Sequence, residues 1–237
     1  MLDALKISIL GVLQFAVVVG LLNLALRHTS SARAALLFSL CPALTLILEA
    51  MLRRRRPSGL QTGGVLLALS GVAIVLGWEA FAGSSQFRWL GEGCALASAL
   101  VAAVCALCYR SFLGRYGALR VGIHALPAAV AVLAGLAALE GFYAVPLSLS
   151  ATGWLAIAFI GCSSAIGYIL WLWALKHASP TRVTVFLTLN PVAAAFFGWL
   201  FLAEPVGTAH AIGVVCVIAG ICLAYCSPAA TKRPAET

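Results

Sequence analysis

Long runs of apolar residues alternate with short polar segments along the whole chain. A run of about 20 apolar residues is long enough to cross a hydrocarbon core about 30 Å thick. We therefore predict eight membrane-spanning helices. They cover 7–26, 32–52, 60–78, 91–112, 119–140, 152–175, 181–203 and 208–226. The polar segments between them are short, so the sequence predicts no separate soluble domain.

Part of this pattern occurs twice. Ala25–Ser30 reads Ala-Leu-Arg-His-Thr-Ser, and Ala174–Ser179 reads Ala-Leu-Lys-His-Ala-Ser. The offset that takes residue 25 to residue 174 holds without a gap for a further stretch. It also pairs Arg33 with Arg182, Pro42 with Pro191, Gly64 with Gly213 and Gly71 with Gly220. Self-similarity at a fixed spacing indicates a repeated structural unit.

The two copies are expected to cross the membrane in opposite directions. Equivalent helices, such as 7–26 and 152–175, are separated by an odd number of spans, which is typical of an inverted-topology repeat. We predict an all-α polytopic helical bundle built from three plus five helices. A truncated first repeat covers 1–78, the second covers 79–227, and a cytoplasmic tail covers 228–237. The parent design would be five plus five, so either this is an eight-span variant or two helices are missing; the intact register favours truncation.

Composition and charge agree with a membrane protein. Hydrophobic residues make up 63% and charged residues 9% of the chain, against about 25% charged residues in soluble domains. When the spans are alternated from one side to the other, only Arg27, Arg33 and Arg88 fall on the side opposite the N-terminus. The remaining lysines and arginines share the N-terminal side, which predicts that both termini are cytoplasmic. The net charge of +8 therefore reflects the bilayer and does not predict nucleic-acid binding.

Specific motifs resemble one family. The segment from Trp171 through Ala178-Ser179-Pro180 to Leu189-Asn190-Pro191, followed by Phe201-Leu-Ala-Glu204-Pro205, is similar to the second half of EamA-type transporters of the drug/metabolite superfamily. The resemblance implies a ten-helix, proton-linked or exchange-type exporter of amino acids, other metabolites or drugs in the cell membrane. It implies an acidic residue at the end of the fourth helix of each repeat. Glu204 fills that position in the second copy, whereas Arg55 stands there in the first.

Two prolines and several polar or aromatic residues are the candidate substrate-binding groups. A mid-helix proline frees the carbonyl four residues earlier, and such a carbonyl needs protein or a wet cavity around it. Polar groups within a span are expected to face inward. The candidates are Gln14, Pro42, Ser98, Ser164, Tyr168, Trp171, Thr188, Asn190 and Pro191. Two simpler readings stay open: the prolines serve only as packing kinks, and the hydroxyls only bond within or between helices.

His124 is the candidate group for proton coupling, because it lies about one turn inside a span and histidine is the side chain that most often serves as a proton switch. A packing role for this histidine stays open. No catalytic pair, metal cluster or cofactor motif is apparent, so we predict no enzyme activity, metal or cofactor. The partners predicted are the lipid bilayer, a small-molecule substrate and a possible second copy of the chain. The predicted function is alternating-access export; the alternative is a truncated or half-sized, non-transporting protein that needs a partner chain.

Overall fold

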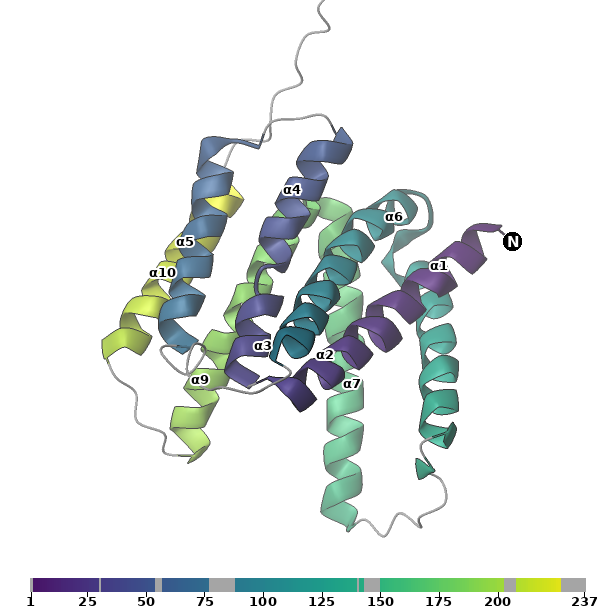
Figure 1. The fold of residues 1–237 in the computed structure, drawn as a ribbon. Coiled ribbons are helices and arrows are strands. Elements are labelled where there is room, and N and C mark those ends of the chain that lie inside the picture. Colours follow the sequence, from purple (N-terminus) through teal and green to yellow (C-terminus); the bar gives the residue numbers. More distant parts are fainter. Residues whose placement is uncertain are drawn as a thin grey trace, which may run out of the picture. The chain divides into compact units, whose positions relative to one another are not determined.

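The computed structural model describes residues 2–29, 31–53, 57–76, 88–139, 141–142, 150–202 and 208–226, and all their regular elements are helices (Figure 1). The α-helices are α1 (Leu2–Val12), α2 (Val18–His28), α3 (Ser31–Phe38), α4 (Cys41–Arg53), α5 (Gly59–Leu76), α6 (Arg88–Leu139), α7 (Ala151–His177), α8 (Pro180–Thr184), α9 (Leu189–Leu202) and α10 (Thr208–Cys226). A π-helix, η1 (Leu13–Val17), joins α1 to α2, and a 3-10 helix, η4 (Val185–Thr188), joins α8 to α9.

Within the described residues, most of each predicted span is helical, and the all-α membrane class is confirmed. Four stretches of these residues are both long enough and apolar enough to cross a membrane: Leu2–His28, Arg33–Leu52, Trp89–Leu139 and Ala151–His177. Gly59–Ile74 and Ala211–Cys226 are shorter apolar helices. The stretch Trp89–Leu139 contains two predicted spans, because Gly117 interrupts it with φ 75° and ψ 163°. Only glycine adopts this backbone conformation at low cost, so Gly117 makes the corner between the two spans.

The chain divides into two compact units, and each is described separately below. Unit 1 comprises Met1–Val17 and Cys108–Ala178, and unit 2 comprises Val18–Leu107 and Ser179–Thr237. Both units draw on both of the repeats expected from the sequence. They are therefore a different division of the chain from the repeats.

In unit 1, α1 packs against the second part of α6. A Cβ atom added to Gly11 would overlap the backbone of Ala125, so the two helices approach closely at this glycine. Ser8 Oγ, on α1, donates a 3.0 Å hydrogen bond to the carbonyl oxygen of His124, which lies next to Ala125 on α6. Hydroxyl-to-carbonyl bonds of this kind hold membrane helices together where apolar contacts alone give little preference over lipid.

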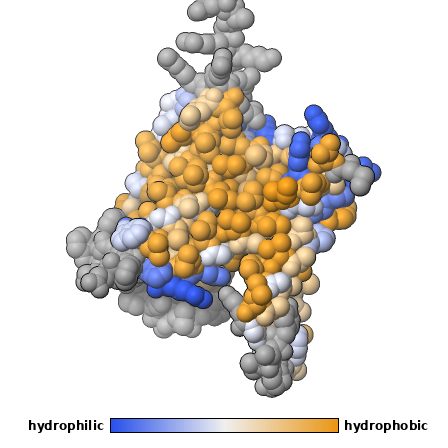
Figure 2. Space-filling view, turned by 45° about the vertical axis from the view of Figure 1, so that its right-hand side comes forward, coloured by the Kyte–Doolittle hydropathy of each residue, from blue (hydrophilic) through white to orange (hydrophobic). Residues whose placement is uncertain are grey.

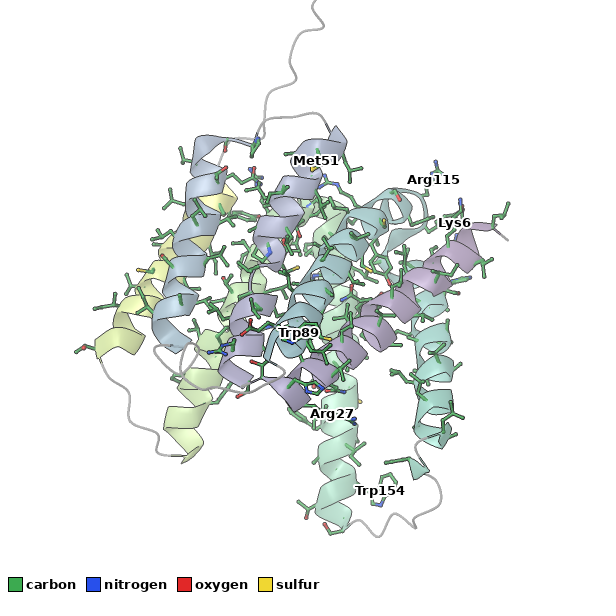
Figure 3. The ribbon with its side chains drawn as sticks, viewed as in Figure 1. Lys6, Arg27, Met51, Trp89, Arg115 and Trp154 are labelled. Atoms are coloured by element: carbon green, nitrogen blue, oxygen red, sulfur yellow. The ribbon has the colours of Figure 1, made fainter. Side chains whose placement is uncertain are left out.

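The corner at Gly117 is also joined to the start of α1. The Asp3 carboxylate accepts a 2.7 Å hydrogen bond from the Tyr116 hydroxyl, and it lies 3.8 Å from Arg115 Nη1. Figure 3 shows Lys6 and Arg115 at the same end of unit 1, with Trp154 at its other end. Within this unit, the cations that the charge pattern assigns to one membrane side therefore lie together.

In unit 2, α5 and α10 lie side by side through their glycines (Figure 1). A Cβ on Gly64 would lie 2.6 Å from the carbonyl oxygen of Gly220, and a Cβ on Gly220 would lie 2.6 Å from that of Gly64. A Cβ on Gly71 would lie 2.6 Å from the carbonyl oxygen of Gly213. Small residues thus let the two backbones touch. The buried side chains around this contact are Leu46, Val65, Ala68, Val72, Val185, Val217, Ile221 and Ala224.

The opposite faces of these two helices are apolar as well. Leu66 on α5 is 60% exposed, and Val215 on α10 is 65% exposed. Figure 2 shows apolar side chains over much of the face it displays, with hydrophilic ones near the margins. Helices that are apolar all round suit a lipid environment, because lipid then satisfies the outward faces.

Candidate functional site

Four aromatic rings gather inside unit 1, from η1, α6 and α7. Tyr168 is the centre of the group: Phe15 meets it edge-on with ring centroids 4.8 Å apart, and Trp171 stacks on it at 6.0 Å. Tyr109 contacts Trp171 edge-on at 5.9 Å. The Tyr168 hydroxyl donates a 2.9 Å hydrogen bond to the Tyr109 hydroxyl. We call Phe15, Tyr109, Tyr168 and Trp171 the aromatic cluster.

The helical spacing of the sequence explains part of this cluster. Tyr168 and Trp171 stand three residues apart on α7, so they share a face. Tyr109 is fully buried and Tyr168 nearly so, whereas Trp171 is half-buried. Phe15 is half-buried as well, so Phe15 and Trp171 are the members of the cluster that an incoming molecule can reach.

Gln14 lies next to Phe15 on the π-helix η1. Among the described residues, its side-chain oxygen Oε1 is buried and has no hydrogen-bond partner. A buried polar atom without a partner costs free energy, on the order of 1–3 kcal/mol, and a bound group can relieve that cost. Single π-turns inside α-helices are frequent at functional sites. Gln14 is therefore the candidate residue with the strongest structural indication of a role in binding.

In unit 2, helices break near both predicted prolines. Pro42 is buried at the second position of α4, after a turn at Ser39 and Leu40 that separates α4 from α3. Pro191 is buried near the start of α9, after the 3-10 segment Val185–Thr188. The two breaks occupy equivalent positions in the two expected repeats. In transporters, backbone groups that bind the solute commonly lie where a membrane helix is interrupted.

The hydroxyl candidates of unit 2 are engaged in helix bonds. Ser98 Oγ donates to the carbonyl oxygen of Val18 at 3.0 Å, which joins α6 to α2. Thr188 Oγ1 donates to the carbonyl oxygen of Val185 at 2.7 Å within its own turn. Both side chains are fully buried. Their bonds match the simpler reading from the sequence, although each hydroxyl oxygen retains the capacity to accept a bond.

The remaining candidates lie apart from these groups. Ser164 on α7 and Asn190 on α9 are exposed. His124 is exposed too, and its Nδ1 lies 2.9 Å from the carbonyl oxygen of Arg120, one turn earlier. Glu204 and Arg55, which the resemblance singles out, lie outside the described residues. The structure thus brings together Tyr168 and Trp171 of the predicted set. Gln14 precedes Phe15, which contacts Tyr168, in the sequence.

Two members of the aromatic cluster were not predicted as binding residues. Phe15 carries no sequence signal beyond its position next to Gln14, since a phenylalanine in an apolar span is equally suited to lipid. Tyr109 lies on one helical face with Ser98 and Cys105, and that spacing does indicate an inward direction. Its contact with Tyr168 depends on how α6 and α7 pack, which spacing does not specify.

The apolar helices of the described residues define a polytopic all-α membrane protein. The chain belongs to the EamA-like transporter family, whose family model matches residues 2–77 and 89–226. The resemblance predicted from the sequence is confirmed. The chain is therefore a multi-pass membrane transporter, and its family and relatives point to transport and away from enzyme activity.

Similar proteins carry related descriptions. A probable terminal-alkyne amino-acid exporter of Streptantibioticus cattleyicolor is 27% identical over 99% of this chain and 77% of that protein. An uncharacterised transporter of Archaeoglobus fulgidus is 27% identical over 92% of this chain and 76% of that protein. A solved crystal structure shares the fold, with a TM-score of 0.78 and 22% identity over 92% of this chain and 76% of the other.

Proposed function

We propose that this chain is a secondary exporter of small amphipathic metabolites, with amino acids as the first class to test. Two observations carry this proposal: the aromatic cluster, and the buried Gln14 Oε1, for which the described residues hold no partner, one residue before Phe15 on η1. The faces of aromatic rings attract ammonium groups, and a free amide oxygen accepts a hydrogen bond from them. Among the relatives, the Streptantibioticus cattleyicolor protein is described as a probable amino-acid exporter, which supports the same class.

The transport cycle is proposed to be alternating access between two inverted repeats. The packing of α5 on α10 supports this symmetry. Under the repeat offset, Gly213 is the equivalent of Gly64, and Gly220 is the equivalent of Gly71. The contact of Gly64 with Gly220 is therefore equivalent to the contact of Gly213 with Gly71. Both contacts are present, which is what a two-fold axis between antiparallel helices produces. The two segments matched by the family model, 2–77 and 89–226, also run close to the expected repeats.

The charge pattern supports a proposal for the orientation in the membrane. We propose a cell-membrane protein with cytoplasmic N- and C-termini, because most of its lysines and arginines fall on that side. The candidate substrate groups remain those predicted from the sequence, to which Phe15 and Tyr109 are added. Pro42 and Pro191 are proposed to line the path where the helices break.

The test is substrate exchange in proteoliposomes. Purified chain is reconstituted into vesicles loaded with a mixture of unlabelled amino acids, and uptake of each labelled amino acid is measured. We expect exchange for a subset of these solutes, and loss of at least 90% of it in Trp171→Ala. Trp173→Ala is the matched control, since Trp173 lies on the same helix, is 57% exposed and contacts only its own helix neighbour His177 among the ring pairs described.

Two results would overturn this proposal. If Trp171→Ala and Trp173→Ala exchange equally well, the site is misplaced. If the native chain exchanges nothing alone but does so when reconstituted with a second polypeptide, the alternative of a partner-dependent protein is correct. Asn190→Ala separately tests the exposed amide of α9, for which we also expect a loss of exchange.

A further inference from the structure

Two polar contacts in unit 2 cross from one proposed repeat to the other. Arg33 Nη1, on α3, lies 3.2 Å from Glu92 Oε1, near the start of α6. Glu49 Oε2, on α4, accepts a 2.8 Å hydrogen bond from Thr181 Oγ1 and a 3.4 Å bond from the Thr181 backbone N–H, on α8. In each contact one residue belongs to 1–78 and the other to 79–227.

The two contacts lie at opposite ends of unit 2. Glu49 lies four residues before the end of α4, and Glu92 lies near the start of α6. Figure 3 shows Met51 at one end of this unit and Trp89 at the other. Met51 follows Glu49 by two residues in the sequence, and Trp89 precedes Glu92 by three. The charge pattern assigns the Met51 end to the cytoplasm and the Trp89 end to the outside.

Neither contact is a freely solvated surface pair. The Arg33 side chain is 8% exposed and that of Glu92 is 36% exposed. Thr181 is fully buried in the first turn of α8, where backbone N–H groups lack partners within the helix. A carboxylate that accepts both a hydroxyl and a backbone N–H bond is favoured by these charge-assisted hydrogen bonds. Contacts of this kind are either formed or broken, so they can separate two discrete states.

We propose that these contacts are the two gates of the transport cycle: Glu49–Thr181 closes the cytoplasmic end, and Arg33–Glu92 closes the outer end. The inference rests on the proposed function. In alternating access the repeats separate at one end while they stay joined at the other, so a contact that crosses the repeats must break whenever its end opens. Breaking one gate therefore favours the state that is open at that end, and this state keeps the other gate closed.

The test is hydrogen–deuterium exchange of the full chain in detergent micelles, read by mass spectrometry at both ends of unit 2. Thr181→Val removes the hydroxyl donor while keeping the side-chain shape. We expect exchange of the amides in 180–184 to rise about five-fold, the effect of one lost hydrogen bond, and exchange in 89–93 to fall. Arg33→Gln should give the reverse. Should Arg33→Gln not fold, Glu92→Ala opens the same gate.

The controls carry the same substitutions outside the gates. Thr184→Val removes a hydroxyl whose bond, among the described residues, goes to the Thr181 carbonyl within its own turn, at 3.3 Å. Arg27→Gln removes an exposed arginine at the Trp89 end. Both should leave the far end unchanged. The gate proposal is wrong if each gate variant changes exchange only at its own end, or raises it at both.

The native chain separates this proposal from the proposed function. If it exchanges substrate in vesicles but its gate variants show no reciprocal shift, the gates are wrong and transport stands. If the reciprocal shift is present while no substrate is exchanged, the proposed function fails and the paired conformational switch remains.

Discussion

A single methyl group at Gly64 should weaken the packing of α5 against α10, whereas the same change at Gly63 should not. The two glycines are neighbours on α5, but Gly64 is buried against α10 and Gly63 is exposed. A Cβ on Gly64 would lie 2.6 Å from the Gly220 carbonyl oxygen and 2.9 Å from the Ala224 Cα atom. A Cβ on Gly63 meets nothing within 4 Å.

The magnitude follows from two opposing effects. Replacing glycine by alanine in a helix interior stabilises the helix by about 1 kcal/mol, and this applies to both variants. At position 64 the helices must also separate by roughly 1 Å to restore ordinary van der Waals distances. Overpacking of a well-packed contact costs about 1–3 kcal/mol. Gly64→Ala should therefore be less stable than Gly63→Ala by about 1–3 kcal/mol.

Thermal unfolding in detergent, followed by the fluorescence of the six tryptophans, measures this difference. For a chain of this length the expected gap is roughly 2–12 °C in Tm. The double variant Gly64→Ala/Gly220→Ala should lose less than the sum of the single variants, because the first methyl group has already separated the helices. A Gly64→Ala protein that melts at or above the temperature of Gly63→Ala would refute the reasoning.

Two further predictions concern the corner of α6 and its contact with α2. Gly117→Ala should destabilise the protein by about 1–3 kcal/mol, because alanine is strained at φ 75° and ψ 163°. Gly114→Ala should not, because Gly114 lacks a positive φ and a Cβ there meets no atom within 4 Å. Measurements of Tm compare the two variants. Ser98→Ala should cost about 0.6 kcal/mol through loss of the bond to Val18, whereas Ser70→Ala, whose hydroxyl is exposed and bonds within its own helix, should be neutral in the same assay.

The helices were predictable because the bilayer imposes one simple requirement on their sequence. Every backbone polar group must be satisfied within the segment, so apolar runs of sufficient length become helices regardless of their neighbours. The break before α4 follows from Pro42 by the same local argument. The π-helix at Leu13–Val17 was not predictable, because an apolar pattern with no proline or glycine inside it is compatible with either helix type.

The contacts between helices were harder to foresee. Spacing along α4 suggests a pair between Glu49 and Arg53, whose side chain is outside the described part of the structure. The carboxylate reaches Thr181, 132 positions away in the sequence, and no spacing along α4 predicts that bond. Likewise, the inward direction of Tyr168 is visible from its helix, but the rings of Phe15 and Tyr109 that contact it come from other helices. Periodicity gives the face of a helix and leaves its neighbour unspecified.

The pairing of α5 with α10 also sets the order in which the protein can be assembled. During synthesis α5 enters the bilayer first, and α6 to α9 are all made before its partner appears. Throughout that time its glycine face has lipid or transient neighbours in place of α10, and the buried group around Val65, Ala68 and Val72 is incomplete. Late contacts of this kind leave a nascent chain open to mispairing and proteolysis. Completion of α10 is therefore a late step of assembly, and a chain arrested before residue 208 should be more open to proteolysis than one that contains α10.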